Sequence, residues 1–303
     1  DHRWFFSPET REALHNGEFQ LSQDDLLTAY REWRNDDVIL HFEDANGEYA
    51  QTISSKRGNW VYAYNKRKKM KHLQTGMDGL IWDYEVPASR SKVIRKTHLL
   101  FITLTFSHRD YTIQDSWRLI TSRGQALNRF SARLSKIVGN KATYKAKEAQ
   151  ESGYAAPHIM VILDRPVTAF KHGKAWRIRD RHIVNQIKEA WPYGFVDVQA
   201  CVGGKVRGSS PISYMMKYAT KTLTREVKSK HGRIAELTHA WNKVFGTRDV
   251  IGRQFLERLN LHAVEPEASP SGWELKDIEI RPSIGRLIGH LVQRSYPAPT
   301  GAG

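Results

Sequence analysis

The 303-residue sequence contains one cysteine, Cys201, which excludes an internal disulfide and a zinc site built from Cys-x-x-Cys pairs. It has no apolar run as long as a membrane span and no secretory leader pattern at its start. Gly203-Gly204-Lys205 lacks the rest of the phosphate-binding loop of ATP-driven motors, and there is neither a nucleophile elbow nor a His-Glu-x-x-His motif. We therefore expect a cytoplasmic protein without a membrane partner.

Acidic residues are in deficit. The chain has 47 Lys and Arg against 32 Asp and Glu, which gives a formal net charge of +15 and an isoelectric point near 9.8. An excess of this kind is the electrostatic footprint of a nucleic-acid-binding protein. The length allows two domains, or one large domain with added elements, and the 40% of hydrophobic residues suffice for sizeable cores.

Residues 1–95 are predicted to form a basic N-terminal α+β region. Ser22 begins a capping-box pattern, followed by apolar residues at helical spacing, which predicts a short amphipathic helix. Further on, Trp60, Tyr62 and Tyr64 alternate with a period of two, which predicts a strand with one aromatic face.

A basic run follows this predicted strand and supplies the first candidate nucleic-acid-binding residues: Lys66, Arg67, Lys68, Lys69 and Lys71. Such a run beside exposed aromatic rings can bind backbone phosphates while unpaired bases stack on the rings. The region would then be an accessory DNA-binding domain. The alternative is a solvated loop after a strand whose aromatic residues belong to the core, and the sequence leaves both interpretations open.

The middle of the chain alternates between strand and helix patterns. The predicted order is strand, helix, strand, strand, helix, strand, helix, over residues 98–106, 117–137, 142–150, 157–163, 183–191, 195–200 and 213–221. This succession predicts an α+β fold with a central antiparallel sheet of split-βαβ, ferredoxin-like type and helices on one side. Arg129 and Arg133 lie off the apolar stripe of the first helix and are further candidates for DNA binding.

The last of these patterns places tyrosines and lysines together. In a helix, Tyr214, Lys217, Tyr218 and Lys221 fall within about 100° of arc, because each residue turns the chain by about 100°. A face of phenols and ammonium groups suits covalent phosphodiester chemistry by tyrosine. The alternative is an amphipathic helix with half-buried tyrosines and solvated lysines.

Three segments together resemble, in order and spacing, the three motifs of HUH rolling-circle replication initiators. They are Phe101-Ile102-Thr103-Leu104-Thr105-Phe106, the Gly-x-x-x-Pro-His strand at 153–163, and Tyr-x-x-Lys-Tyr-x-x-Lys at 214–221. The paired tyrosines resemble the gene A type of bacteriophage initiator and its archaeal plasmid and viral relatives. The resemblance covers residues 96–225 as a nicking and joining domain, and residues 226–303 would be a helical C-terminal extension.

The resemblance implies a replication initiator that nicks single-stranded DNA at an origin. Tyr214 and Tyr218 fall on the positions of the nucleophiles, and Lys217 and Lys221 on the accompanying lysines. A tyrosine hydroxyl would attack a phosphodiester and form a 5′-phosphotyrosine intermediate, and the free 3′-hydroxyl would prime synthesis. Nearby ammonium groups favour the ionised phenol, whose pKa is otherwise near 10. The implied partners are origin DNA and the helicase and polymerase of the host of a plasmid or virus.

The implied metal site departs from the family pattern, because His158-Ile159-Met160 stands where such initiators carry His, a bulky residue and His. A divalent Mg²⁺ or Mn²⁺ prefers oxygen and imidazole ligands to a thioether. We expect His158 to be one ligand and Glu148, on the preceding strand, another. Three explanations stay open: the cation has fewer protein ligands together with DNA phosphate, another residue substitutes, or the site is impaired.

Other residues are alternative ligands. Glu151 replaces Glu148 if the hairpin register is shifted, and His108 or Asp197 could also contribute, although Asp197 fits a structural role better. Two functions therefore compete: a metal-assisted nickase and joining enzyme, and a catalytically weakened relative that binds origin or single-stranded DNA. Near the C-terminus, an apolar pattern over residues 284–292 predicts an amphipathic helix that docks on the core.

Overall fold

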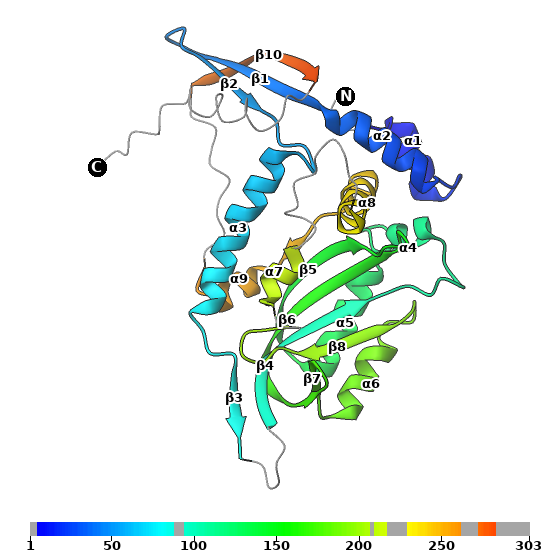
Figure 1. Cartoon of the computed structure of the whole chain (residues 1–303), viewed down its shortest axis with the longest axis vertical. Coiled ribbons are helices and arrows are strands. Elements are labelled where there is room, and N and C mark those ends of the chain that lie inside the picture. Colours follow the sequence, from blue (N-terminus) through cyan, green and yellow to red (C-terminus); the bar gives the residue numbers. More distant parts are fainter. Residues whose placement is uncertain (1–4, 88–93, 207–208, 217–228, 262–271, 283–303) are drawn as a thin grey trace.

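The computed structural model contains a large sheet flanked by helices and a small sheet at one end of the molecule (Figure 1). None of its described helices combines the length and the apolar composition that crossing a membrane requires. The structure describes residues 5–87, 94–206, 209–216, 229–261 and 272–282.

Within the described residues, the large sheet has seven strands, and each paired neighbour is antiparallel. The order across the sheet is β3-β4-β8-β7-β6-β5-β9, with an additional pairing of β4 with β6. The strands are β3 (Asp83–Val86), β4 (Ile94–Leu104), β5 (Lys141–Ala149), β6 (Ala155–His172), β7 (Ala175–Ile178), β8 (Val196–Ala200) and β9 (Val250–Ile251).

The centre of this sheet has the expected split-βαβ order. Strand β4 pairs with β8 on one side and with β6 on the other, and β6 pairs in turn with β5. Helices α4 (Ile113–Leu119) and α5 (Ala126–Val138) connect β4 to β5, and α6 (Arg181–Glu189) precedes β8. The α+β class predicted from the alternating patterns is therefore confirmed.

The single helix predicted over residues 117–137 is wrong, because the chain breaks between α4 and α5. Gly124 packs against the end of α4 so closely that a Cβ there would lie 2.3 Å from the carbonyl oxygen of Arg118. Thr121 Oγ1 donates to the same carbonyl and accepts from the Gly124 N–H at 3.0 Å. The two apolar stripes align well enough in sequence to read as one helix, and this local turn separates them.

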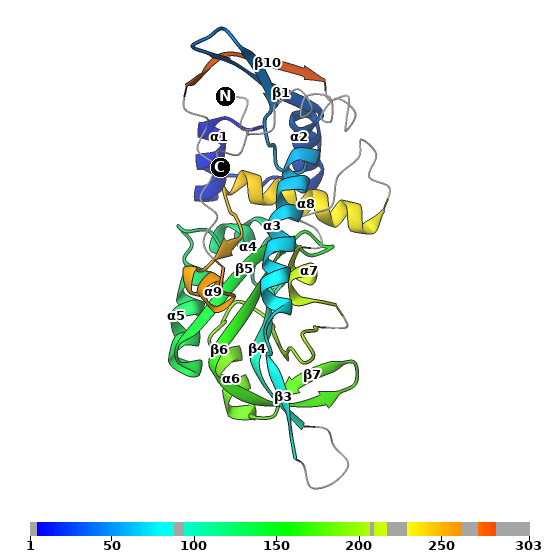
Figure 2. The same cartoon turned by 90° about the vertical axis from the view of Figure 1, so that its left-hand side faces the viewer.

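Helices cover both faces of the large sheet, whereas the sequence predicted them on one. Leu100 and Val161 belong to a core with α4, α5 and α6, and Phe101 and Met160 belong to a second core on the opposite face. This second core is covered by α3 (Trp60–Asp78), α7 (Pro211–Met216) and α9 (Arg253–Arg258), onto which Figure 2 looks. Strand residues alternate between the two faces, which explains why β4 reads as a continuous apolar run.

The strand predicted at Trp60, Tyr62 and Tyr64 is also wrong, since these residues begin α3. Asn59 caps this helix, and its side-chain oxygen accepts from the Tyr62 N–H at 2.9 Å. The basic run is therefore helical rather than a loop. Three alternating aromatic residues are too few to decide between a strand and the first turns of a capped helix.

The small sheet joins the two ends of the described chain. Strand β1 (Asp36–Asp44) pairs with β2 (Tyr49–Ile53) and with β10 (Trp273–Pro282). Helices α1 (Pro8–Asn16) and α2 (Gln23–Asn35) precede it, and Ser22 caps α2 as predicted. The C-terminal extension was expected to be helical: it contains α8 (Lys230–Val244) and α9, but β10 is a strand. The helix predicted over 284–292 lies outside the described residues.

Candidate functional site

Glu148 and His158 lie side by side on the face of the sheet covered by α3 and α7. His158 pairs with Ala146 and Glu148 pairs with Ala156 across β5 and β6, so the two side chains are diagonal neighbours on one face. His158 Nε2 lies 3.1 Å from Glu148 Oε2. The exposed fractions are 7% for His158 and 4% for Glu148. The structure thus brings together the two residues that the sequence selected as ligands.

Thr103 fixes the orientation of the His158 ring, and sequence reasoning gave it no role. It pairs with His158 across β4 and β6, and its Oγ1 lies 3.0 Å from His158 Nδ1. With Nδ1 engaged in this way, Nε2 is the nitrogen directed at Glu148. The signal in the sequence was a polar residue inside an apolar strand, on the same face as Phe101.

Tyr214 stands edge-on to the His158 ring. The ring centroids of Tyr214 and His158 are 5.8 Å apart with an interplanar angle of 84°. Tyr214 is also edge-on to Phe101, at 5.2 Å, and Phe101 stacks beside His158 at 5.5 Å. One candidate nucleophile therefore adjoins the His158–Glu148 pair, while the other candidates on this helix, Lys217, Tyr218 and Lys221, lie outside the described residues.

Helix α7, which carries Tyr214, is anchored on both sides. Ile212 and Met215 are fully buried in the core that contains Phe101. Ser210 precedes the helix: its Oγ accepts from the Ser213 N–H at 3.1 Å and donates to Gln74 Oε1 on α3. The N-terminal helix α3 thus contacts the start of the helix that presents the tyrosine.

Helix α8 supports β5 at the position of Glu148. The Thr238 hydroxyl accepts from the Ala149 N–H at 2.9 Å, and the Asn242 side chain donates to the Lys147 carbonyl at 2.9 Å. These bonds replace strand pairing on both sides of Glu148, where β9 no longer accompanies β5. Burial lowers the pKa of Lys147 to about 8, and its Nζ donates to a carbonyl at 2.6 Å.

Met160 occupies the position of the second imidazole of the family pattern and is fully buried. It pairs with Phe101 on β4 and with Tyr144 on β5, so that apolar groups surround it. The described residues contain no group of three or more His, Cys, Asp or Glu that could hold a metal ion. One imidazole nitrogen and one carboxylate oxygen remain, a donor pair that fits Mn²⁺ or Mg²⁺ when phosphate and water complete its coordination.

The alternative ligands lie elsewhere. Glu151 forms an ion pair with Lys230, and His108 stacks on Tyr154 at 3.9 Å. Asp197 is on the same face as His158, because both pair with Thr103, but it forms an ion pair with Arg177 on β7. None of these carboxylates or imidazoles forms a three-residue metal group with the His158–Glu148 pair among the described residues.

Arg177 brings a positive charge toward the same face, and no sequence signal singled it out. Its NH1 donates to Asp197 and, at 3.1 Å, to the Val198 carbonyl. About a third of its side chain is exposed, 37%. A guanidinium held in this way can pair with a phosphate at the edge of the site.

The predicted basic residues divide between two faces of the molecule. On α3, Lys66 forms an ion pair with Asp249 at 2.7 Å, while the outward residues Arg67, Lys68, Lys69 and Lys71 are exposed. Burial opposes the charged forms of Lys66 and Asp249, but their contact prevails, since the pKa of Lys66 is raised and that of Asp249 lowered.

Arg129 and Arg133 are on α5, which packs on the opposite face of the sheet from Glu148 and His158. Arg129 donates to the Gly124 carbonyl at 2.8 Å, and Arg133 to the Ala190 carbonyl at 3.2 Å. The structure does not bring these two arginines to the His158–Glu148 pair.

Residues 99–223 match the family of Replication-associated protein ORF2/gene 2 protein, and the match spans less than half of the 303-residue chain. The matched segment includes β5, β6, β8 and α7 and most of β4, and it contains Thr103, Glu148, His158 and Tyr214. No curated protein and no solved structure gives a significant match. The match supports a replication-associated role of the kind that initiators of rolling-circle replication have, with DNA at an origin as the partner.

Proposed function

We propose that the protein is an HUH-type nickase that cleaves single-stranded origin DNA through a tyrosine and rejoins it during rolling-circle replication. The observation that carries this proposal is the contact of Tyr214 with His158, which is itself 3.1 Å from Glu148. The three residues come from α7, β6 and β5 and meet on one face of the sheet. A nucleophile beside a candidate cation site is the arrangement that phosphodiester cleavage needs.

In the proposed reaction, the tyrosine oxygen attacks phosphorus and the bond from phosphorus to the 3′-oxygen breaks. The phenol gives up its proton and the departing 3′-oxygen gains one, so a 5′-phosphotyrosine and a free 3′-hydroxyl result. The bond energy is retained in the phosphotyrosine, which allows a 3′-hydroxyl to reverse the step and join strands. Tyr214 and Tyr218 are the proposed nucleophiles, and Lys217 and Lys221 are proposed to favour the ionised phenol.

His158 and Glu148 are the residues that would hold a divalent Mg²⁺ or Mn²⁺. When bound, such an ion would neutralise charge on the phosphate and polarise it. Thr103 keeps the His158 ring oriented through its contact with Nδ1. Met160 contributes no oxygen or nitrogen, so phosphate and water would complete the coordination sphere.

The outward side of α3 is the proposed path for the DNA strand. Tyr64 is 51% exposed on this helix, and Lys68 and Lys71 follow it at positions four and seven. In a helix these positions share a face, so that phosphates can contact the ammonium groups while a base stacks on the ring. Host helicase and polymerase are proposed to act on the nicked product.

The proposal is tested with a pool of 3′-labelled single-stranded oligonucleotides of random sequence, incubated with the protein and Mn²⁺. We expect a protein–DNA adduct that survives denaturation, and sequencing of the attached DNA then identifies the origin. Tyr214→Phe combined with Tyr218→Phe should abolish the adduct and leave DNA binding intact. Tyr84→Phe, at an exposed tyrosine on β3, is the matched control. An adduct that persists in the double variant would disprove the assignment of the nucleophiles.

A second candidate function is DNA binding without cleavage. It is favoured by Met160, which leaves the described part of the site with only two ligands. In that case no adduct would form with Mn²⁺, Mg²⁺ or other divalent ions, and binding to single-stranded DNA would persist and weaken with salt. The same oligonucleotide pool therefore separates the two functions.

A further inference from the structure

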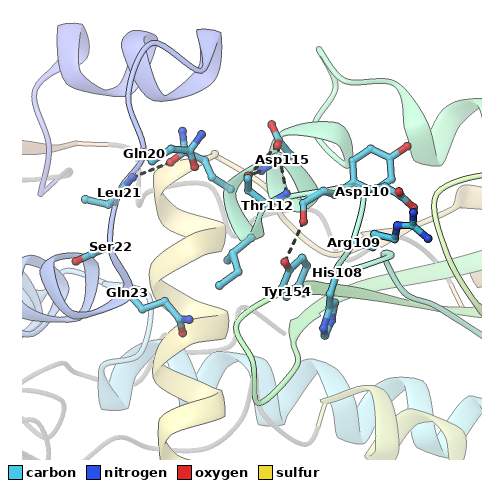
Figure 3. Close-up of a pocket in the computed structure, with 13 residues that line it drawn as sticks. Gln20, Leu21, Ser22, Gln23, His108, Arg109, Asp110, Thr112, Asp115 and Tyr154 are labelled. Atoms are coloured by element: carbon cyan, nitrogen blue, oxygen red, sulfur yellow. Dashed lines mark hydrogen bonds between the residues drawn. The ribbon is translucent and has the colours of Figure 1, made fainter.

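A pocket of about 530 Å³ lies beyond the end of β4, between the large sheet and the segment that precedes α2 (Figure 3). Its walls come from the loop after β4, the turn between β5 and β6, and residues 20–23. The volume falls within the range of small-molecule sites, roughly 300 to 1,000 Å³. Neither the proposed nucleophile nor the His158–Glu148 pair lines this pocket.

Two stacked rings form one wall. His108 lies parallel to Tyr154, with ring centroids 3.9 Å apart and an interplanar angle of 17°. The Tyr154 hydroxyl donates to the Tyr111 carbonyl at 2.9 Å, and His108 Nε2 lies 3.3 Å from Gln150 Oε1. Both rings are thus held in place from their edges, while His108 stays exposed. A fixed and exposed ring face is suited to stacking with a planar ligand.

The opposite wall is fastened to the same turn. Gln23 donates to the Ser152 carbonyl at 3.1 Å, and the Leu21 N–H donates to Gln114 Oε1 at 2.9 Å. Gly153 has a φ of +92°, and a Cβ there would lie 2.7 Å from Gln23 Oε1, so that the walls can approach this closely only at a glycine. The pocket is therefore formed by contacts within the protein before any ligand arrives.

The pocket continues the proposed cleavage site along the strand. Gln150, which contacts His108, follows Glu148 by two residues and therefore lies about 7 Å farther along the same side of β5. Arg109 and Gln20 are exposed and line the pocket as well. A strand whose phosphate is bound near Glu148 thus passes a ring platform, a guanidinium and an amide.

We propose that this pocket binds one unpaired nucleobase of the DNA strand held at the cleavage site, with the base stacked on His108. The inference rests on the proposed function and adds a position at which the enzyme holds the substrate. Every base has a flat face, so stacking accepts any of them, while Arg109 and Gln20 can contact base edges and introduce a preference. His108 is thereby a binding residue rather than a metal ligand.

The test measures fluorescence anisotropy of a short labelled oligothymidylate and of an abasic strand of equal length, both in EDTA so that no cleavage occurs. His108→Ala should weaken oligothymidylate binding roughly tenfold, as loss of one stacked base does. It should leave binding of the abasic strand unchanged. His108→Phe should restore binding to within about twofold, because it keeps the stacking face. His182→Ala, at an exposed histidine on α6, is the matched control.

Three results would overturn the proposal. One is that His108→Ala binds oligothymidylate as tightly as the unchanged protein does. Another is that His108→Phe is as weak as His108→Ala, since the imidazole itself would then matter. The third is an equal loss on the abasic strand, which would assign His108 to the phosphates. Adduct formation is measured separately, so the pocket can fail while the nickase stands, and the reverse.

Discussion

The hydroxyl of Ser210 at the start of α7 donates to the side chain of Gln74 on α3. Helix α3 lies in the region that the sequence separates from the nicking domain, yet its Leu73 and Met77 are buried in the same core as Phe101. Gln74 therefore positions the helix that carries Tyr214 from outside the matched segment. A cut at residue 95 would remove one wall of the site as well as any DNA-binding function.

Replacing Gln74 with Ala should slow adduct formation about five- to tenfold, since one neutral hydrogen bond contributes about 1 kcal/mol. Oligonucleotide affinity should not change, because Gln74 acts on the tyrosine helix and not on DNA. Single-turnover rates at saturating DNA separate the two effects. Thr75→Ala, at the neighbouring exposed residue, is the control. A parallel loss of affinity and rate would show that Gln74 contacts DNA instead.

The elements that the sequence predicted well are those whose pattern is long. The strands β4, β5, β6 and β8 have apolar or alternating runs bounded by turns, and their order fixes the pairing of β5 with β6. Because Glu148 and His158 stand near the two ends of one hairpin turn, their proximity followed from register alone. Tyr214 could be added only through the resemblance, since α7 packs on the sheet by non-local contacts.

The features that the sequence missed depend on contacts between distant segments. Strand β10 pairs with β1 across more than two hundred residues, and no local pattern indicates such a partner. Arg177 reaches the site because β7 places it beside Asp197. The start of α3 resembles a strand in sequence because its rings alternate, and the cap at Asn59 is the local feature that favours a helix instead.

Thr103→Val should weaken Mn²⁺ binding at the His158–Glu148 pair by roughly 10- to 100-fold, as loss of an orienting partner does in metal sites. The valine keeps the shape of the side chain and removes the group that contacts Nδ1 at 3.0 Å. Isothermal titration with Mn²⁺ measures the affinity directly. Thr105→Val, two residues along the same chain, is the control, and an equal loss in both would refute an orienting role.

Met160→Leu should preserve Mn²⁺ affinity and adduct formation, because the thioether contributes no ligand and the two side chains have similar volume. The free energy of unfolding should change by less than about 1.5 kcal/mol. A tenfold loss of Mn²⁺ affinity in this variant would show that the sulfur does bind the cation.

Met160→His is the complementary change. It places a second imidazole on the same face as His158, in a position that is fully buried. Without metal the variant should be less stable, because the new ring nitrogens meet apolar neighbours. Mn²⁺ should raise its melting temperature more than that of the unchanged protein, since a third ligand strengthens binding to the folded state. Equal shifts on adding Mn²⁺ would place position 160 out of reach of the ion.

His239 should make the protein sensitive to acid. It is fully buried on α8 beside Tyr62, and among the described residues neither ring nitrogen has a hydrogen-bond partner. Burial, with a smaller contribution from Arg57, lowers its pKa from 6.5 to about 3. Between these values the unfolded state binds more protons than the folded state. The free energy of unfolding should therefore fall as the pH drops below 6.5, by up to about 1.4 kcal/mol per unit.

His239→Leu should remove this part of the acid sensitivity, because leucine fills the apolar site and has no proton to bind. Urea denaturation at several pH values between roughly 7.5 and 4 measures the slope, with the ionic strength held constant. His182→Ala is the control, since an exposed imidazole has the same surroundings in both states. A His239→Leu variant that loses stability with acid as steeply as the unchanged protein would assign the sensitivity to other groups, with the buried carboxylate of Asp249, whose pKa is lowered, as the first to examine.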